Sequence, residues 1–107
     1  MADEAIEEAF SSALKLHQAG RSNEAARIYG EILQKRPDCA EALHHLGIIE
    51  AQAGRNGSAI NLIRRAIALK PGFVEAHHNL GHVLVNGPEP EEAVRAYREA
   101  VALRADR

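Results

Sequence analysis

Residues of the same kind recur along this chain at a fixed spacing of 34 positions. Ala25, Ala59 and Ala93 are one period apart, and Gly47 and Gly81 are too. Further sets in the same register are Tyr29, Ile63 and Tyr97; Ile32, Ala66 and Ala100; and Pro37 and Pro71. A period of this length with two helices per unit is the signature of a helical repeat array. Such arrays present extended binding surfaces, so the period predicts a binding protein and leaves its partner open.

Six amphipathic helices in three pairs can be placed between turn-forming residues. We expect them at about 3–19, 22–35, 40–53, 57–69, 74–85 and 90–104. Gly20 and Gly54 follow the first helix of their pairs, where a left-handed residue ends a helix. Pro37 and Pro71 stop the second helices. The pattern therefore predicts an all-α solenoid of three antiparallel helix pairs.

Polar residues and one proline mark the helix starts. Asp38 and Glu41 stand three apart ahead of the third helix, which predicts a capping box. Asn56 is expected to cap the fourth helix, and Pro90 is expected at the first position of the sixth. The chain then divides into contiguous repeats at about 6–39, 40–73 and 74–107, within one domain over 1–107.

Composition excludes several classes of function. The net charge is −2 and aromatic residues make up 4%, without tryptophan, so neither a basic stripe nor a stacking platform for nucleic acid is expected. No apolar run reaches the ~18–20 residues that span a membrane. The acidic start MADEAIEEAF does not read as a signal peptide, and Cys39 is the only cysteine. We expect a cytoplasmic protein without cofactor, and we find no catalytic motif.

The repeated residues resemble those of the tetratricopeptide repeat family. The second repeat supplies Leu43, Leu46, Gly47, Gly54, Ala59, Ile63, Ala66 and Pro71, and the third supplies His77, Leu80, Gly81, Ala93, Tyr97 and Ala100. The first matches through Gly20, Ala25, Tyr29, Ile32 and Pro37. The resemblance implies a right-handed superhelix whose first helices line a concave groove for a peptide or partner helix. The phrases HHLG and HNLG also resemble bacterial arrays that precede glycosyl- or sulfotransferase domains.

Family geometry places a mixed polar and aliphatic set of side chains in the groove. These candidates are Phe10, Leu14, His17, Gln18, His44, His45, Ile48, Ala51, Gln52, His78, Asn79, His82, Val85 and Asn86. Glu7, Glu41 and Glu75 lie along one edge. Some members of the family hold a chaperone's terminal carboxylate with lysine, asparagine and arginine. Here His44, His78, Leu14 and Ile48 replace most of that clamp, and only Asn79 remains.

The histidines allow two interpretations. His78 and His82 are four apart on one helix and share a face, and His44 is one period before His78. Three imidazoles lack the fourth ligand of a closed metal site, so we predict solvated groove histidines and no metal site, with a metal-responsive binder as the alternative. His77 takes a core position and should be packed and hydrogen-bonded, whereas His17 and His45 are expected at the surface.

The sixth helix exposes an apolar face formed by Val94, Tyr97 and Val101. Burying the three side chains is worth ~5–9 kcal/mol, against ~4–15 kcal/mol for association. Two-fold pairing through this face is therefore a prediction. The leading hypothesis is a non-catalytic interaction module that scaffolds an assembly. The alternatives are a substrate-recruiting segment of a transferase system and a self-assembling structural protein.

Overall fold

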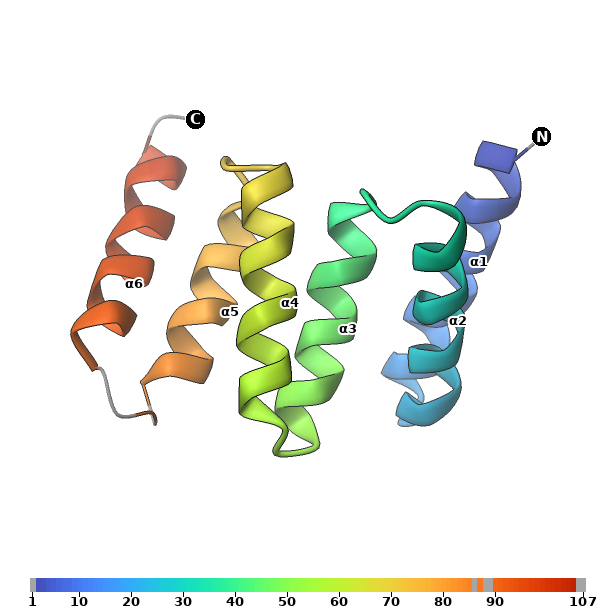
Figure 1. Ribbon diagram of the computed structural model, residues 1–107, viewed down its shortest axis with the longest axis horizontal. Helices are drawn as coiled ribbons and strands as arrows, with labels where there is room; N and C mark the ends of the chain where they lie inside the picture. Colours follow the sequence, from blue (N-terminus) through green and yellow to red (C-terminus); the bar gives the residue numbers. More distant parts are fainter. Residues whose placement is uncertain (1, 86, 88–89, 106–107) are drawn as a thin grey trace.

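The computed structural model describes residues 2–85, 87 and 90–105, and every regular element among them is an α-helix. The helices lie side by side in an elongated array (Figure 1), whose principal extents are 41 × 31 × 22 Å. They are α1 (Ala2–Gln18), α2 (Ser22–Lys35), α3 (Ala40–Gln52), α4 (Asn56–Leu69), α5 (Val74–Leu84) and α6 (Pro90–Ala105). Each predicted helix is confirmed to within one residue at either end.

The turns inside the first two helix pairs use the predicted glycines. Gly20 has φ +83° and Gly54 has φ +84°, both in the left-handed region. The next residue bonds back across the end of the helix, with Arg21 N–H donating to Leu16 C=O at 2.8 Å and Arg55 N–H to Glu50 C=O at 2.9 Å. This Schellman geometry reverses the chain at once and makes each pair antiparallel.

Two predicted helix caps are wrong. The residue that caps α4 is Arg55, not Asn56, and it makes no side-chain cap bond. Arg55 already ends the turn after α3, and its carbonyl accepts from Ala59 N–H at 3.0 Å, so Asn56 becomes the first helical residue. The cap of α3 is Cys39, without a side-chain bond. The capping-box residue Glu41 instead meets Lys70 at 3.2 Å.

Close approach within each pair explains the repeated mid-helix glycines. A Cβ on Gly47 would lie 2.8 Å from Ile63 Cγ1 and 3.3 Å from Ala59 C=O. A Cβ on Gly81 would lie 2.8 Å from the Tyr97 ring. Glycine in mid-helix costs about 0.5–1 kcal/mol relative to alanine. The missing side chain lets Ile63 and Tyr97 of the paired helices pack directly against the glycine backbone.

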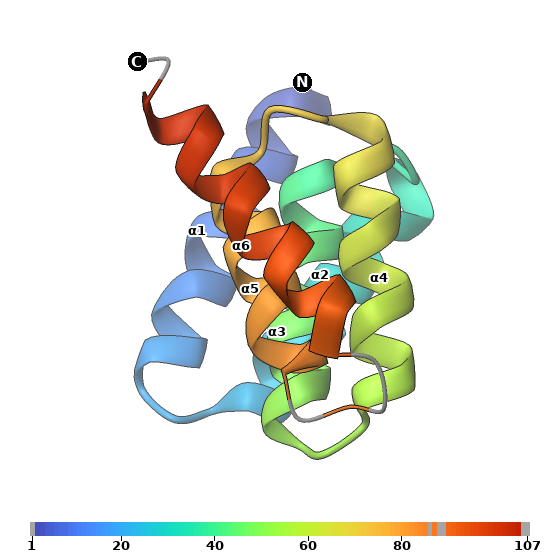
Figure 2. The same ribbon diagram turned by 90° about the vertical axis from the view of Figure 1, so that its left-hand side faces the viewer.

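The core runs along the stack without a break between repeats. One cluster of buried residues joins α1, α2 and α3 around Tyr29, and a second joins α3 to α6 around Leu43 and Ile63. Leu33 packs against both clusters. Figure 2 looks along the stack from the α6 end and shows the helices behind one another in successive pairs. Each pair therefore completes its core on its neighbour.

Candidate binding surface along the inner helices

Equivalent side chains link the first helices of the three pairs, which we call the inner helices: α1, α3 and α5. Phe10 meets His45 with ring centroids 5.3 Å apart. His17 Nε2 donates to Gln52 Oε1 at 2.8 Å. Asn79 donates from Nδ2 to His44 Nε2, also at 2.8 Å. Each contact joins residues 35 apart, so each inner helix packs against the next in the same register. The three helices therefore form one continuous surface.

His44 is buried, although we predicted a solvated groove histidine. Only 3% of it is exposed, because Phe73 in the turn between repeats packs its ring 4.7 Å away. Desolvation, followed by the neighbouring His45 charge, lowers the pKa of His44 to about 4, and Glu75 and Glu41 oppose that shift only in part. His44 is therefore neutral at pH 7, and its bond to Asn79 is a structural link between α3 and α5.

His45 also departs from the prediction that it lies at the surface. It is half-buried and stacks on Tyr29, with ring centroids 5.7 Å apart and an interplanar angle of 11°. Desolvation lowers its pKa, and the His17 charge adds to the effect. Burial raises the pKa of Tyr29 to about 12. The 34-residue period could have revealed the burial of His45, because Asn79, one period later, also lies between two inner helices.

His77 matches its predicted role, whereas His17 is less exposed than predicted. His77 is half-buried, and its Nε2 donates to the Pro71 carbonyl at 2.9 Å. The prediction of a packed, hydrogen-bonded histidine is confirmed. His17 is half-buried, and its ring donates a hydrogen bond to Gln52 on the next inner helix.

The accessible part of the inner surface is mixed polar and aliphatic, with an acidic edge. Leu14 and Ile48 are half-buried, and Gln18, Gln52, His82 and Val85 are exposed; Asn86 falls outside the described residues. A hollow of about 350 Å³ between α1 and α3 is lined by Ile6, Glu7, Phe10, Cys39 and Glu41. Glu7, Glu41 and Glu75 are all exposed. Neither α3 nor α5 contains a lysine or arginine, so these two helices offer carboxylates and neutral groups.

His78 and His82 form a pair that the third predicted member does not join. Their Nε2 atoms share a hydrogen bond at 3.1 Å, while His44 is occupied by Asn79. Among the residues that the structure describes, no group of three or more His, Cys, Asp or Glu side chains could hold a metal ion. The alternative of a three-histidine set is therefore wrong.

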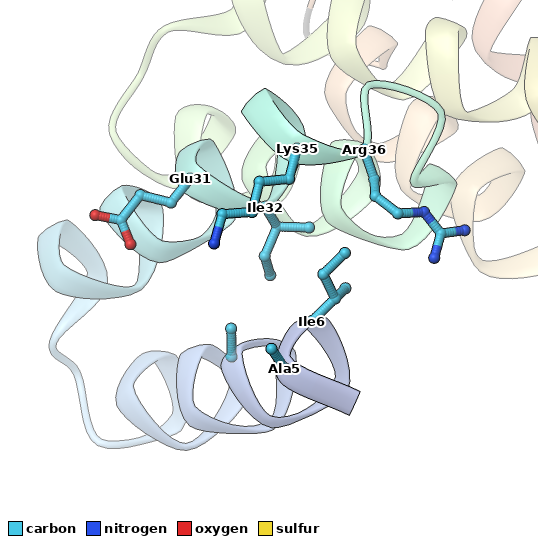
Figure 3. Close-up of a pocket in the computed structure, with 7 residues that line it drawn as sticks. Ala5, Ile6, Glu31, Ile32, Lys35 and Arg36 are labelled. Atoms are coloured by element: carbon cyan, nitrogen blue, oxygen red, sulfur yellow. The ribbon is translucent and has the colours of Figure 1, made fainter. Parts of the chain in front are cut away.

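Sequence reasoning did not predict a hollow between α1 and α2, at the N-terminal end of the array. It measures about 190 Å³ and is lined by Ala5, Ile6, Ala9, Glu31, Ile32, Lys35 and Arg36. In Figure 3, Ile32 of α2 points toward α1, and the Glu31 and Arg36 side chains extend away at the rim. The period could have revealed it, because Ala40 and Val74, which correspond to Ile6, are buried by the preceding pair.

The predicted face on α6 is open to solvent. Val94 and Val101 are 47% and 64% exposed, and they line a shallow hollow of about 400 Å³ together with Tyr97, Arg98 and Ala102. Ile60 and Ile67 hold the equivalent places on α4, where they pack against the core. No described helix of this chain gives α6 the cover that α5 gives α4.

Comparison with known families decides what this array is. A family model described as tetratricopeptide repeat matches residues 12–72 and again 46–107. The chain belongs to the tetratricopeptide repeat family. No curated protein sequence matches it. None of the described helices is both long and apolar enough to cross a membrane.

Solved structures share the tetratricopeptide fold. A mutant O-GlcNAc transferase of Thermobaculum terrenum matches 99% of this chain at 36% identity, with a TM-score of 0.95. A crystal structure of MamA matches 94% of this chain at 20% identity, with a TM-score of 0.85. The first TPR of Spaghetti (RPAP3), bound to an HSP90 peptide, matches 95% of this chain at 17% identity, with a TM-score of 0.88. This chain spans 20% of the transferase, 59% of MamA and 81% of the Spaghetti domain. The right-handed solenoid is confirmed.

Among the described residues of the inner helices, the positions of the family's carboxylate clamp carry no lysine or arginine. Asn79 is the one residue that matches the family's carboxylate clamp, and its amide donates a hydrogen bond to His44. Leu14 and Ile48 stand at other clamp positions and offer no donor. The groove therefore differs in charge from one that holds an acidic chain end.

Proposed function

We propose that this chain is a non-catalytic interaction module that holds a peptide or helix along its inner surface and so scaffolds an assembly. The inner helices supply Leu14 and Ile48 for apolar contact, and Gln18 and Gln52 for hydrogen bonds to a partner's backbone. The observation that carries the proposal is the fixed register of α1, α3 and α5, because a preformed surface spares the ordering cost of binding. A protein of the same fold, the Spaghetti domain, is bound to a peptide.

The charges of this surface favour a basic or neutral segment as the partner. Glu7, Glu41 and Glu75 recur at one phase of the repeat, and α3 and α5 bring no cation. Glu41 already binds Lys70 at 3.2 Å, and the same lysine lies 4.7 Å above the Phe73 ring. The chain's own Lys70 thus shows a carboxylate and an aromatic ring of this surface accepting a cation.

Peptides selected from a random display library on this chain should carry net positive charge. Changing Glu7→Gln together with Glu75→Gln should weaken a selected, fluorescein-labelled peptide about fivefold, since two exposed charge pairs contribute ~0.5 kcal/mol each. Fluorescence anisotropy measures the affinity. Glu31→Gln with Glu99→Gln removes the same charge from α2 and α6 and should leave it unchanged. Acidic selected peptides, or equal losses in both variants, would contradict the proposal.

A second candidate is a substrate-recruiting segment of a glycosyltransferase. The 36% identity to the O-GlcNAc transferase over nearly the whole chain favours it. Replacing the matching segment of that enzyme with this chain should preserve transfer to protein acceptors. A segment of equal length from an unrelated tetratricopeptide protein is the control and should lower it. Equal loss in both chimeras would count against this candidate.

We also propose that two copies pair through the α6 face. The alternative of an open-ended polymer would dock α1 of one copy on α6 of the next. In α1, Glu8, Ser12 and Lys15 stand where α5 has Ala76, Leu80 and Val83, so a head-to-tail contact would bury charge. A closed two-fold contact of Val94, Tyr97 and Val101 avoids that cost.

The molar mass from light scattering should rise toward that of a dimer as concentration increases. Val101→Glu should abolish the rise, because it places a carboxylate in the centre of the apolar face. Val85→Glu changes another exposed valine outside the face and should behave as the wild type does. A wild-type chain that stays monomeric at high micromolar concentration would refute the pairing.

A further inference from the structure

We propose that His78 and His82 form a chelating site for one divalent transition-metal cation of the Ni²⁺, Cu²⁺ and Zn²⁺ class. The two residues lie one turn apart on α5, and their rings share a hydrogen bond. The site has two protein ligands, and water takes the remaining positions. This differs from the three-histidine set, which the structure does not assemble.

The distance between the two imidazoles suits a shared metal ion. Their Nε2 atoms are 3.1 Å apart. With metal–nitrogen bonds of 2.0–2.1 Å, two nitrogens on one ion are about 2.9 Å apart at a right angle and about 3.4 Å apart at the tetrahedral angle. The observed separation falls between these values. A cation placed to one side of the line that joins the two nitrogens would therefore bond to both without moving the backbone of α5, once the rings, which stand at 81° to each other, turn their lone pairs toward it.

The rings are held in place by a neighbouring helix. Tyr97 of α6 packs edge-on against His78 at 5.6 Å and against His82 at 5.7 Å. Gly81 lets the Tyr97 ring approach, since a Cβ there would collide with it. Side chains already restricted lose less rotamer freedom on binding. His78 is half-buried and His82 is exposed, so an ion from solvent can reach the pair.

The other histidines lack this arrangement. His17 is bonded to Gln52, His44 to Asn79, and His77 to the Pro71 carbonyl. The fourth, His45, is stacked on the Tyr29 ring. Imidazole ligands suit nickel, copper and zinc, whereas magnesium and calcium require oxygen ligands. The pair is therefore expected to bind Cu²⁺ most tightly and not to bind Mg²⁺.

Isothermal titration calorimetry with nickel chloride alone, on the whole chain at pH 7.5, tests the proposal. We expect saturable binding of one ion per chain. His82→Ala should weaken it about 10²-fold or more, because the second ring no longer acts at the high effective concentration of a chelate. His17→Ala is the matched control, since it removes an inner-surface histidine without a second imidazole one turn away. It should leave the affinity unchanged.

A variant with the same number of histidines makes the test sharper. His82→Ala combined with Val85→His moves the second ring two turns from His78, beyond the reach of a shared ion. It should bind nickel as weakly as His82→Ala does. Proton NMR should show paramagnetic broadening of the His78 and His82 ring signals first. Absence of saturable binding, or an affinity that neither His82 variant lowers, would overturn the proposal.

Discussion

Replacing Tyr29 with alanine is expected to lower the free energy of unfolding by about 3–5 kcal/mol, the usual cost of emptying a large aromatic site in a core. Tyr29 is fully buried. Its ring meets Phe10 of α1 at 5.6 Å and His45 of α3 at 5.7 Å. One side chain of α2 therefore joins the first pair to the second. Urea denaturation followed by far-ultraviolet circular dichroism measures the loss.

Tyr29→Phe is the matched control. The Tyr29 hydroxyl is buried and has no hydrogen-bond partner among the residues described. Removing a buried hydroxyl without a partner costs nothing and can recover part of its desolvation penalty, about 1 kcal/mol. Tyr29→Phe should therefore be as stable as the wild type or slightly more so. A loss of several kcal/mol in this variant, or a negligible loss in Tyr29→Ala, would contradict the packing at this junction.

Acidification from pH 7 to pH 4 is expected to lower the free energy of unfolding by about 3 kcal/mol through His44 alone. Burial lowers its pKa from 6.5 to about 4 in the folded chain. The unfolded chain therefore binds the proton first. Stability is complete above about pH 6.5 and falls as the pH drops toward 4. The lowered pKa of His45 acts in the same direction.

Urea midpoints measured across this pH range test the effect. His44→Gln keeps an acceptor for the Asn79 amide and removes the titrating ring, so its stability should fall much less between pH 6.5 and 4. Glu41 and Glu50 have lowered pKa values, so their stabilising charges begin to be lost only as the pH falls to about 4.5, at the acid end of the range, and equally in both proteins. If the wild type and His44→Gln lose equal stability above pH 4, then His44 is not buried in its neutral form.

The 34-residue period was sufficient to predict the helices, their pairing and the turn glycines. Each of these depends on local sequence and on positions that repeat. Gly47 and Gly81 even located the close approach of paired helices, because only a packing contact explains a costly glycine at one phase. The cap at Asn56 was mispredicted because the compact Schellman turn gave Arg55 two roles. The cap at Asp38 was mispredicted because α3 begins one residue later, with Cys39 as its cap.

The inner surface was harder to predict, because family geometry names positions but not what covers them. His44 was placed in the groove, and its backbone position agrees with that. Its burial depends on Phe73, where the first repeat has Cys39, a much smaller side chain. The period cannot show such a difference between repeats. His45 was missed for a similar reason, since its burial requires the Tyr29 ring from the preceding pair.

Amide chemical shifts during titration with a selected basic peptide test most directly whether the inner surface is the binding surface. The proposed binding mode predicts that the largest changes fall in α1, α3 and α5, near Leu14, Ile48 and His82. The amide chemical shifts of α2 and α4, the second helices of the first two pairs, should change little. Changes concentrated on α2 and α4, with the inner helices unaffected, would contradict it.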